Sequence, residues 1–144
     1  MTTAAQILEG KGHEVWSVAP GASVYDALKL MAEKNVGALL VLDGDELKGI
    51  FSERDYARKV ILAGKSSREI TVKEIMSPAV ITVRPQQSVE ECMSLMTDKR
   101  IRHLPVVESG RLVGVISIGD AVKAIISERE FTIEQLQSYI RGSG

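Results

Sequence analysis

The sequence predicts an α+β fold in which two tandem β-α-β-β-α repeats pack about a pseudo-twofold axis, and three observations predict it. Residues 15–60, shifted by 65 positions, lie on residues 80–125 without a gap and with 14 identical pairs among 46. In each copy a serine precedes apolar residues at helical spacing. Two short apolar runs around a turn rich in Asp, Gly or Ser then indicate a hairpin. Because one copy is too small to cover its own sheet, the halves should share a core.

The first copy begins with a short extended piece at residues 15–18, followed by a helix that Ser23 is placed to cap. Two apolar runs, 38–42 and 47–51, flank Asp43-Gly44-Asp45 and predict a hairpin. A second helix follows the hairpin. The apolar residues that predict the two helices are Val24, Ala27, Leu28 and Met31 for the first, and Tyr56, Ala57, Val60 and Ile61 for the second.

The second copy repeats this order, with an extended piece at 80–83, a capping Ser88, and a hairpin from 104–107 and 112–116. Its helices are predicted from Val89, Cys92, Met93 and Met96, and from Ala121, Val122, Ile125 and Ile126. Outside the repeats we expect a small helix at 4–8, a loop at 64–68, a helical turn at 72–76, and a C-terminal amphipathic helix (Phe131, Ile133, Leu136, Tyr139, Ile140) that packs on the module or on a partner. The predicted organisation is an N-terminal helical segment (1–14), repeat 1 (15–63), a connector (64–79), repeat 2 (80–127), and a C-terminal helix and tail (128–144).

Composition limits the functions to consider. With 18 basic and 19 acidic residues and a net charge of -1, the chain is unlike a nucleic-acid or membrane-surface binder. Cys92 is the single cysteine, so no intrachain disulfide can form, and its place on the apolar stripe predicts a packed core thiol. No apolar run reaches the roughly 20 residues of a membrane helix, and no signal peptide is visible. We therefore expect a cytoplasmic protein without a metal site, and Trp16 is expected in the core or in a pocket wall.

Each copy closes on the same motif, in which a strand ends on a serine and an aspartate follows three residues later. The pairs are Ser52 with Asp55, and Ser117 with Asp120. One interpretation is a capping box, where the serine and the acidic side chain satisfy the first backbone N–H groups of a helix. The other is a ligand site, because a helix N-terminus favours phosphate and an aspartate can accept two hydrogen bonds from ribose hydroxyls. The recurrence of the motif in both copies favours the ligand site.

A basic cluster leads into the second hairpin, where Arg102 and His103 could hold a phosphate. The aligned residues of the first copy are Gly37 and Ala38, so the two candidate pockets differ chemically. The first copy offers Arg54 and Arg58 instead, although most such side chains form a solvated face. Gly64-Lys65-Ser66 is rejected as a phosphate-binding loop, because Lys59 stands where that loop needs glycine.

These motifs resemble the cystathionine-β-synthase-type (CBS) domain pair, or Bateman module, over about residues 15–126, and in particular its stand-alone bacterial-type members. The residues that carry the resemblance include 24–27, 35–39, 52–56, 100–105 and 116–120. The resemblance implies binding of an adenine nucleotide (AMP, ADP, ATP, NAD(H)) or S-adenosylmethionine in the clefts between the repeats. It also implies a homodimer and a protein target that responds to the ligand.

Carried over by position, the resemblance implies that Asp55 and Asp120 hold ribose hydroxyls and that Ser52 and Ser117 lie near ribose or phosphate. Family sites often have threonine where these two serines stand. The full set of expected ligand-binding residues is Ser17, Gly37, Ala38, Ser52, Arg54, Asp55, Arg58, Met76, Thr82, Arg102, His103, Pro105, Ser117, Gly119 and Asp120. Met76 is expected to touch the base, and Ser17 and Thr82 to approach from the first strands.

These residues suggest three alternative functions. The first is a non-catalytic sensor of adenine nucleotides, with no catalytic cofactor. The second is a structural interaction module whose ligand clefts are degenerate, in which Asp55 and Asp120 only cap helices. The third, an enzyme using Arg102 or His103 with a carboxylate, lacks an activated nucleophile or a metal site in the sequence. The sequence therefore predicts a binding protein and not an enzyme.

Overall fold

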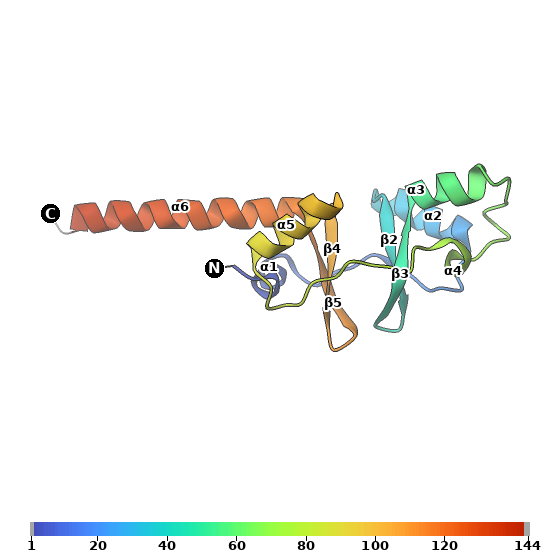
Figure 1. Cartoon of the computed structure of the whole chain (residues 1–144), viewed down its shortest axis with the longest axis horizontal. Helices are drawn as coiled ribbons and strands as arrows, with labels where there is room; N and C mark the ends of the chain where they lie inside the picture. The colour runs from blue at the N-terminus through green and yellow to red at the C-terminus, as the bar shows by residue number, and fades with distance from the viewer. Residues whose placement is uncertain (1, 143–144) are drawn as a thin grey trace. The chain divides into compact units, whose positions relative to one another are not determined.

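The computed structural model describes residues 2–142 of the chain, with side chains as far as residue 140. Met1 and the last two residues of the predicted C-terminal tail, 143 and 144, lie outside the described residues. The chain divides into two compact units, whose elements are labelled in Figure 1. The first-repeat unit holds Val15–Ile81 and Ser109–Leu112, and the second-repeat unit holds Met1–Glu14, Thr82–Glu108 and Val113–Gly144. Each unit is described by itself.

The first-repeat unit is a small sheet with helices, as the sequence predicts. Its elements are β1 (Ser17–Val18), α2 (Val24–Lys34), β2 (Ala38–Asp43), β3 (Glu46–Ser52), α3 (Glu53–Tyr56), the π-helix η1 (Ala57–Ile61) and α4 (Val72–Ile75). Strand β1 pairs parallel with β2, and β2 pairs antiparallel with β3. Gly44 turns the β2–β3 hairpin with φ +66°, a conformation that glycine adopts without steric cost. Phe51 on β3 and Val41 on β2 are fully buried against the apolar stripe of α2.

The second-repeat unit repeats this plan. Its elements are α1 (Ala4–Lys11), α5 (Val89–Lys99), β4 (His103–Glu108), β5 (Arg111–Ser117) from Val113 onward, and α6 (Ile118–Gly142). The turn after β4 and the first two residues of β5 belong to the first-repeat unit. Strands β4 and β5 are hydrogen-bonded neighbours, joined by a turn at Ser109 and Gly110, whose φ angles of 53° and 79° are both positive. Turns of this kind match the twist of a hairpin. The predicted mixed α+β class is confirmed.

Serine caps begin the first helix of both repeats, as predicted. The Ser23 Oγ accepts the Asp26 N–H at 3.0 Å, and the Ser88 Oγ accepts the Glu91 N–H at 3.2 Å. Both helices end in a left-handed residue, Asn35 after α2 and Arg100 after α5. Cys92 is fully buried on α5, which confirms a packed core thiol, and burial followed by the charge of Glu91 raises its pKa.

Some local expectations need correction. The extended piece of the second copy at 80–83 pairs with β4 only through a single parallel bridge between Val83 and Val106, the equivalent of Val18 and Val41 in the first copy. The second helix of repeat 2 and the C-terminal helix are one continuous helix, α6, because no glycine or proline interrupts residues 120–141. Trp16 is 37% exposed, so it is not in the core, and its place in a pocket wall stays a prediction; the Lys34 Nζ lies 4.4 Å from the centre of its ring.

The two units exchange the helices that precede their repeats. Helix α4, which comes before repeat 2, packs in the first-repeat unit, where the Val24 N–H donates to the Ile70 carbonyl at 2.9 Å. Helix α1, which comes before repeat 1, packs in the second-repeat unit, where the Val89 N–H donates to the Thr2 carbonyl at 2.8 Å. Each exchanged helix covers a glycine of the repeat that receives it. The residues that face these glycines are Met76 and Ser77 over Gly49, and Leu8 over Gly114.

Candidate functional site

The structure divides the expected ligand-binding residues between the two units. The first-repeat unit holds Ser17, Gly37, Ala38, Ser52, Arg54, Asp55, Arg58 and Met76. The second-repeat unit holds Thr82, Arg102, His103, Pro105, Ser117, Gly119 and Asp120. Each unit therefore has its own serine–aspartate pair at the junction of a strand and a helix.

In both units the backbone brings the start of one hairpin strand next to this junction. The Gly37 carbonyl accepts the Glu53 N–H at 3.0 Å, and the Arg102 carbonyl accepts the Ile118 N–H at 2.8 Å. Gly37 and Arg102 are equivalent in the repeat, as are Glu53 and Ile118. The structure thus places the predicted second-strand residues beside the predicted serine–aspartate motif in each unit.

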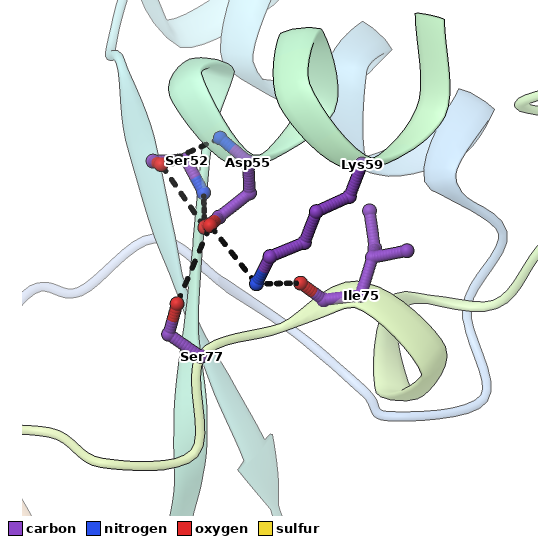
Figure 2. Close-up of polar contacts among 5 residues, drawn as sticks. All are labelled: Ser52, Asp55, Lys59, Ile75 and Ser77. Atoms are coloured by element: carbon purple, nitrogen blue, oxygen red, sulfur yellow. Dashed lines mark hydrogen bonds and ion pairs between the residues drawn. The ribbon is translucent and has the colours of Figure 1, made fainter. Parts of the chain in front are cut away.

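The serine and aspartate of the first-repeat unit form a complete capping box (Figure 2). The Ser52 N–H and Oγ both donate to the Asp55 Oδ2 at 3.0 Å, and the Asp55 N–H donates to the Ser52 Oγ at 3.2 Å. The structural interpretation of the motif is therefore correct here. It accounts for one carboxylate oxygen of Asp55.

The other oxygen of Asp55 receives two further groups, which Figure 2 also shows. The Ser77 Oγ donates to the Asp55 Oδ1 at 3.3 Å, and the Lys59 Nζ lies 3.3 Å from the same atom. Lys59 also donates to the Ile75 carbonyl at 3.0 Å, which ties η1 to the end of α4. We name these residues around Asp55 the first carboxylate site.

In the second-repeat unit Asp120 has a different set of partners. The Ser117 N–H donates to the Asp120 Oδ2 at 2.8 Å, and the Asp120 N–H donates to the Ser117 Oγ at 3.1 Å. The Lys11 Nζ forms an ion pair with the same Oδ2 at 2.6 Å and donates to the Val115 carbonyl at 3.0 Å. Lys11 is the last residue of α1. We name this set the second carboxylate site.

The two sites are similar in plan but not in charge. Ile50 and Val115 are equivalent in the repeat, and their carbonyls accept from different donors. The Ile50 carbonyl accepts the Ser77 N–H at 2.9 Å, whereas the Val115 carbonyl accepts from the ammonium of Lys11. Sequence reasoning missed Lys11, Lys59 and Ser77, because none of them lies in the repeated motif and only the exchange of α1 and α4 brings Lys11 and Ser77 to the carboxylates.

Asp120 and His103, whose charges act on each other, both have shifted pKa values. Burial alone would raise the pKa of Asp120, but the hydrogen bonds from Lys11 and Ser117 and the charge of Lys11 outweigh it and lower the pKa. The pKa of His103 is lowered by desolvation of its ring and by the charges of Lys11 and Arg102, against the opposing charge of Asp120. The site therefore holds an ionised aspartate and a neutral histidine near pH 7.

We expect the free energy of unfolding to fall as the pH drops, in two windows. Below about pH 6.5 the unfolded chain binds a proton at His103 more readily than the folded unit does, because folding lowers the pKa of His103. Below about pH 4 the same holds for Asp120. Denaturant unfolding from pH 3 to 8 measures this. Lys11→Met should reduce both losses, because Lys11 lowers both pKa values. Lys123→Met is the matched control, and an equal effect of the two variants would contradict the assignment.

The remaining expected residues lie in varied surroundings. Arg54, Arg58, Thr82, Arg102 and Gly119 are exposed, so they are accessible without being held in place. Pro105 is buried in β4, and its carbonyl accepts the Val83 N–H at 3.0 Å. Met76 is half-buried and packs against the core of the first-repeat unit.

An open groove of about 590 Å³ lies in the second-repeat unit between α1 and α6. Lys11, Asp120 and Lys123 line it together with apolar side chains of both helices, among them Ile7 and Phe131. Across this groove Glu128 of α6 accepts hydrogen bonds from the N–H and hydroxyl of Thr2. The second carboxylate site is therefore continuous with a surface groove that carries both signs of charge.

Within residues 2–142, no three or more His, Cys, Asp or Glu side chains group as they would around a metal ion. In the same part of the chain no helix is both long and apolar enough to span a bilayer. Location in the cytoplasm stays an expectation from the sequence.

Comparison with known proteins adds the family. The model of the CBS-domain family matches residues 12–61 and 72–127. The chain is 41% identical to the mitochondrial CBS domain-containing protein CBSX3 of Arabidopsis thaliana, over 98% of this chain and 73% of the relative.

Solved structures agree with this match. A CBS-domain protein from Burkholderia ambifaria is 55% identical, with a TM-score of 0.77 over 88% of this chain and 95% of its own. The hexameric CBS-CP12 protein from bloom-forming cyanobacteria is 29% identical, with a TM-score of 0.67 over 100% of this chain and 89% of its own. Pairs of CBS domains are generally regulatory, ligand-binding modules. From the repeat, the motif and these matches together, the chain belongs to the CBS-domain family.

Proposed function

We propose that the protein is a non-catalytic regulatory module that binds adenine nucleotides at its two carboxylate sites. The observation that carries the proposal is the repeated arrangement of Asp55 and Asp120. In each unit a serine fixes the aspartate at a strand–helix junction, and a lysine lies against its carboxylate. A carboxylate accepts hydrogen bonds from the two hydroxyls of a ribose, and a lysine attracts phosphate. Both chemical requirements of a nucleotide are thus present at one place.

The lysines suggest how a nucleotide would enter. In the structure Lys11 forms an ion pair with Asp120, and Lys59 forms one with Asp55. A ribose would replace the lysine at the carboxylate, and the lysine would turn to the phosphate of the same ligand. After the exchange the carboxylate accepts hydrogen bonds from the ribose and the lysine pairs with the phosphate, so each charged group keeps a polar partner, which limits the cost of desolvation. The exposed Arg102 and the neutral His103 of the second-repeat unit add two further groups for phosphate.

The test is a calorimetric titration of the full chain with AMP, ADP, ATP, NAD⁺, NADH and S-adenosylmethionine. At least one should bind, and it should raise the melting temperature because it binds only the folded state. Asp55→Ala and Asp120→Ala should each weaken binding at their own site by tenfold or more. They also lose a helix cap, at a cost of about 1 kcal/mol.

Ser23→Ala is the matched control for that loss. It removes an N-cap hydrogen bond from α2 without touching either aspartate. It should lower the melting temperature and leave nucleotide affinity unchanged. If none of the six compounds binds the wild-type chain, the proposal is wrong.

A structural interaction module is the second candidate, and the complete capping of both aspartates favours it. Ser52 and Ser117 each donate to one carboxylate oxygen of their aspartate, as capping alone requires. In that case Asp55→Ala and Asp120→Ala would lower stability as Ser23→Ala does, and no nucleotide would bind. The same titration therefore separates the two functions.

We further propose that the protein is a homo-oligomer whose regulated target responds to the bound nucleotide. The cyanobacterial CBS-CP12 protein, which matches the whole of this chain, is hexameric by its description. Its assembly supports self-association here.

A further inference from the structure

The second half of α6 is a helix without a covering surface. The first turns of α6 are anchored, since Ala121 is fully buried and Ala124, Ile125 and Glu128 are half-buried. From Arg129 to Ile140 every side chain is exposed. In Figure 1 this part of α6 runs on past α1 and α5 of its own unit. An isolated helix of this length is marginal in water, so we expect its exposed half to pack against a partner. The pattern of side chains on its surface indicates which kind of partner.

One face of α6 has the spacing of a coiled-coil seam. Its residues alternate by four and three positions, which keeps them on one side of the helix. Five of the six are apolar and 41–71% exposed. The members of this α6 seam are Val122, Ile126, Arg129, Ile133, Leu136 and Ile140.

The charges on α6 decide against a lipid surface. Helices that lie on membranes carry a basic polar face. Residues 118–142 have four acidic and three basic residues, and Glu128, Glu130 and Glu134 follow one another within two turns. An apolar seam with acidic flanks fits another helix.

The order of the seam residues favours a second copy of the same helix. The steps run four, three, four, three, four, and so read the same in both directions. When two copies lie antiparallel about residue 131, Val122 meets Ile140, Ile126 meets Leu136, and Arg129 meets Ile133. All six positions then have a partner, and none is left over.

Arg129 sets the direction. In a parallel pair in register, each Arg129 would face the other across the seam, and the two like charges would repel. In the antiparallel pair Arg129 faces Ile133 of the second copy, and Glu130 lies three residues before that Ile133, one turn away. A carboxylate is then available to the guanidinium while its alkyl stem packs on the seam.

We propose that the α6 seam is a self-association surface, on which the α6 of a second chain packs antiparallel about residue 131. The exposed half of the helix is then stabilised by burying its apolar face. The surface is separate from the carboxylate sites, so the inference does not depend on nucleotide binding.

Cysteine cross-linking in the full chain tests the arrangement. An equal mixture of the single variants Ile126→Cys and Leu136→Cys should form a disulfide-linked dimer under mild oxidation. Neither variant alone should do so. In the antiparallel pair the two copies of the same residue are ten positions apart along the helix axis, about 15 Å, which is too far for a disulfide. The native Cys92 is fully buried and does not compete. A covalent dimer of either variant alone, or none from the mixture, overturns the proposal.

Sedimentation equilibrium provides the second measurement. Leu136→Glu, on the seam, should weaken self-association by tenfold or more. Gln135→Glu is the matched control, because it adds the same charge at a neighbouring exposed position off the seam. Equal association of these two variants would also overturn the proposal.

Discussion

Gly49→Ala is expected to lower the free energy of unfolding by about 2–3 kcal/mol, at the upper end of what overpacking costs. A Cβ at this position would lie 2.8 Å from the Ser77 carbonyl oxygen and 2.9 Å from the Met76 Sδ. That oxygen cannot move away, because two backbone hydrogen bonds between Ser77 and Ile50, of 2.9 and 3.0 Å, hold the segment on β3. Urea unfolding with linear extrapolation measures the loss.

Gly114→Ala should cost less, about 1–2 kcal/mol. Its Cβ would lie 2.7 Å from the Leu8 Cδ2, which is the end of a side chain and can shift, although Leu8 is fully buried. Gly21→Ala is the control, since a Cβ there meets nothing within 4 Å. If Gly49→Ala unfolds at the same urea concentration as Gly21→Ala, the close packing of the α4 segment on β3 is wrong.

Lys11→Met is expected to weaken the binding of AMP at the second carboxylate site by tenfold or more, which corresponds to about 1.4 kcal/mol. The same variant should leave adenosine binding unchanged or tighter, because it frees Asp120 for the ribose while removing a cation for the phosphate. Wild-type protein should accordingly prefer AMP to adenosine. Calorimetric titration with the two compounds measures the ratio.

Lys59→Met should act in the same direction at the first carboxylate site but by less. Its ammonium lies 3.3 Å from Asp55 and shares that oxygen with Ser77, whereas the Lys11 ion pair measures 2.6 Å. For Lys11→Met the control is Lys123→Met, which removes a second lysine from the groove at the second carboxylate site. If the ratio of the affinity for AMP to the affinity for adenosine is the same in wild type, Lys11→Met and Lys123→Met, Lys11 does not bind the phosphate, even where AMP binds.

Much of the fold could be predicted because local chemistry and the repeat agree. Ser23, Ser88 and Ser52 begin helices because a hydroxyl in that position satisfies free N–H groups, and the apolar alternation sets the hairpins. The length of α6 does not follow from the repeat, because the repeat ends before Glu128 and its end predicts a boundary between two helices, whereas residues 120–141 contain no glycine or proline to end the first one.

The helix exchange could not be found from the ungapped repeat. Thr3 and Thr71 occupy equivalent capping boxes of α1 and α4, but they are 68 residues apart, whereas the repeats are offset by 65. The three extra residues hide the correspondence from a search at a single shift. The contact of Lys11 with Asp120 depends on the same exchange, so the repeat does not predict it either.

The placement of α1 also orders the events of synthesis. Its residues are synthesised before those of the first-repeat unit, yet the groups that bury them belong to α5, β5 and α6, which are synthesised after that unit. A nascent chain therefore carries Leu8 and its neighbours without their final surroundings while most of the first-repeat unit is already available to fold. Folding of the second-repeat unit should accordingly wait for the synthesis of α6.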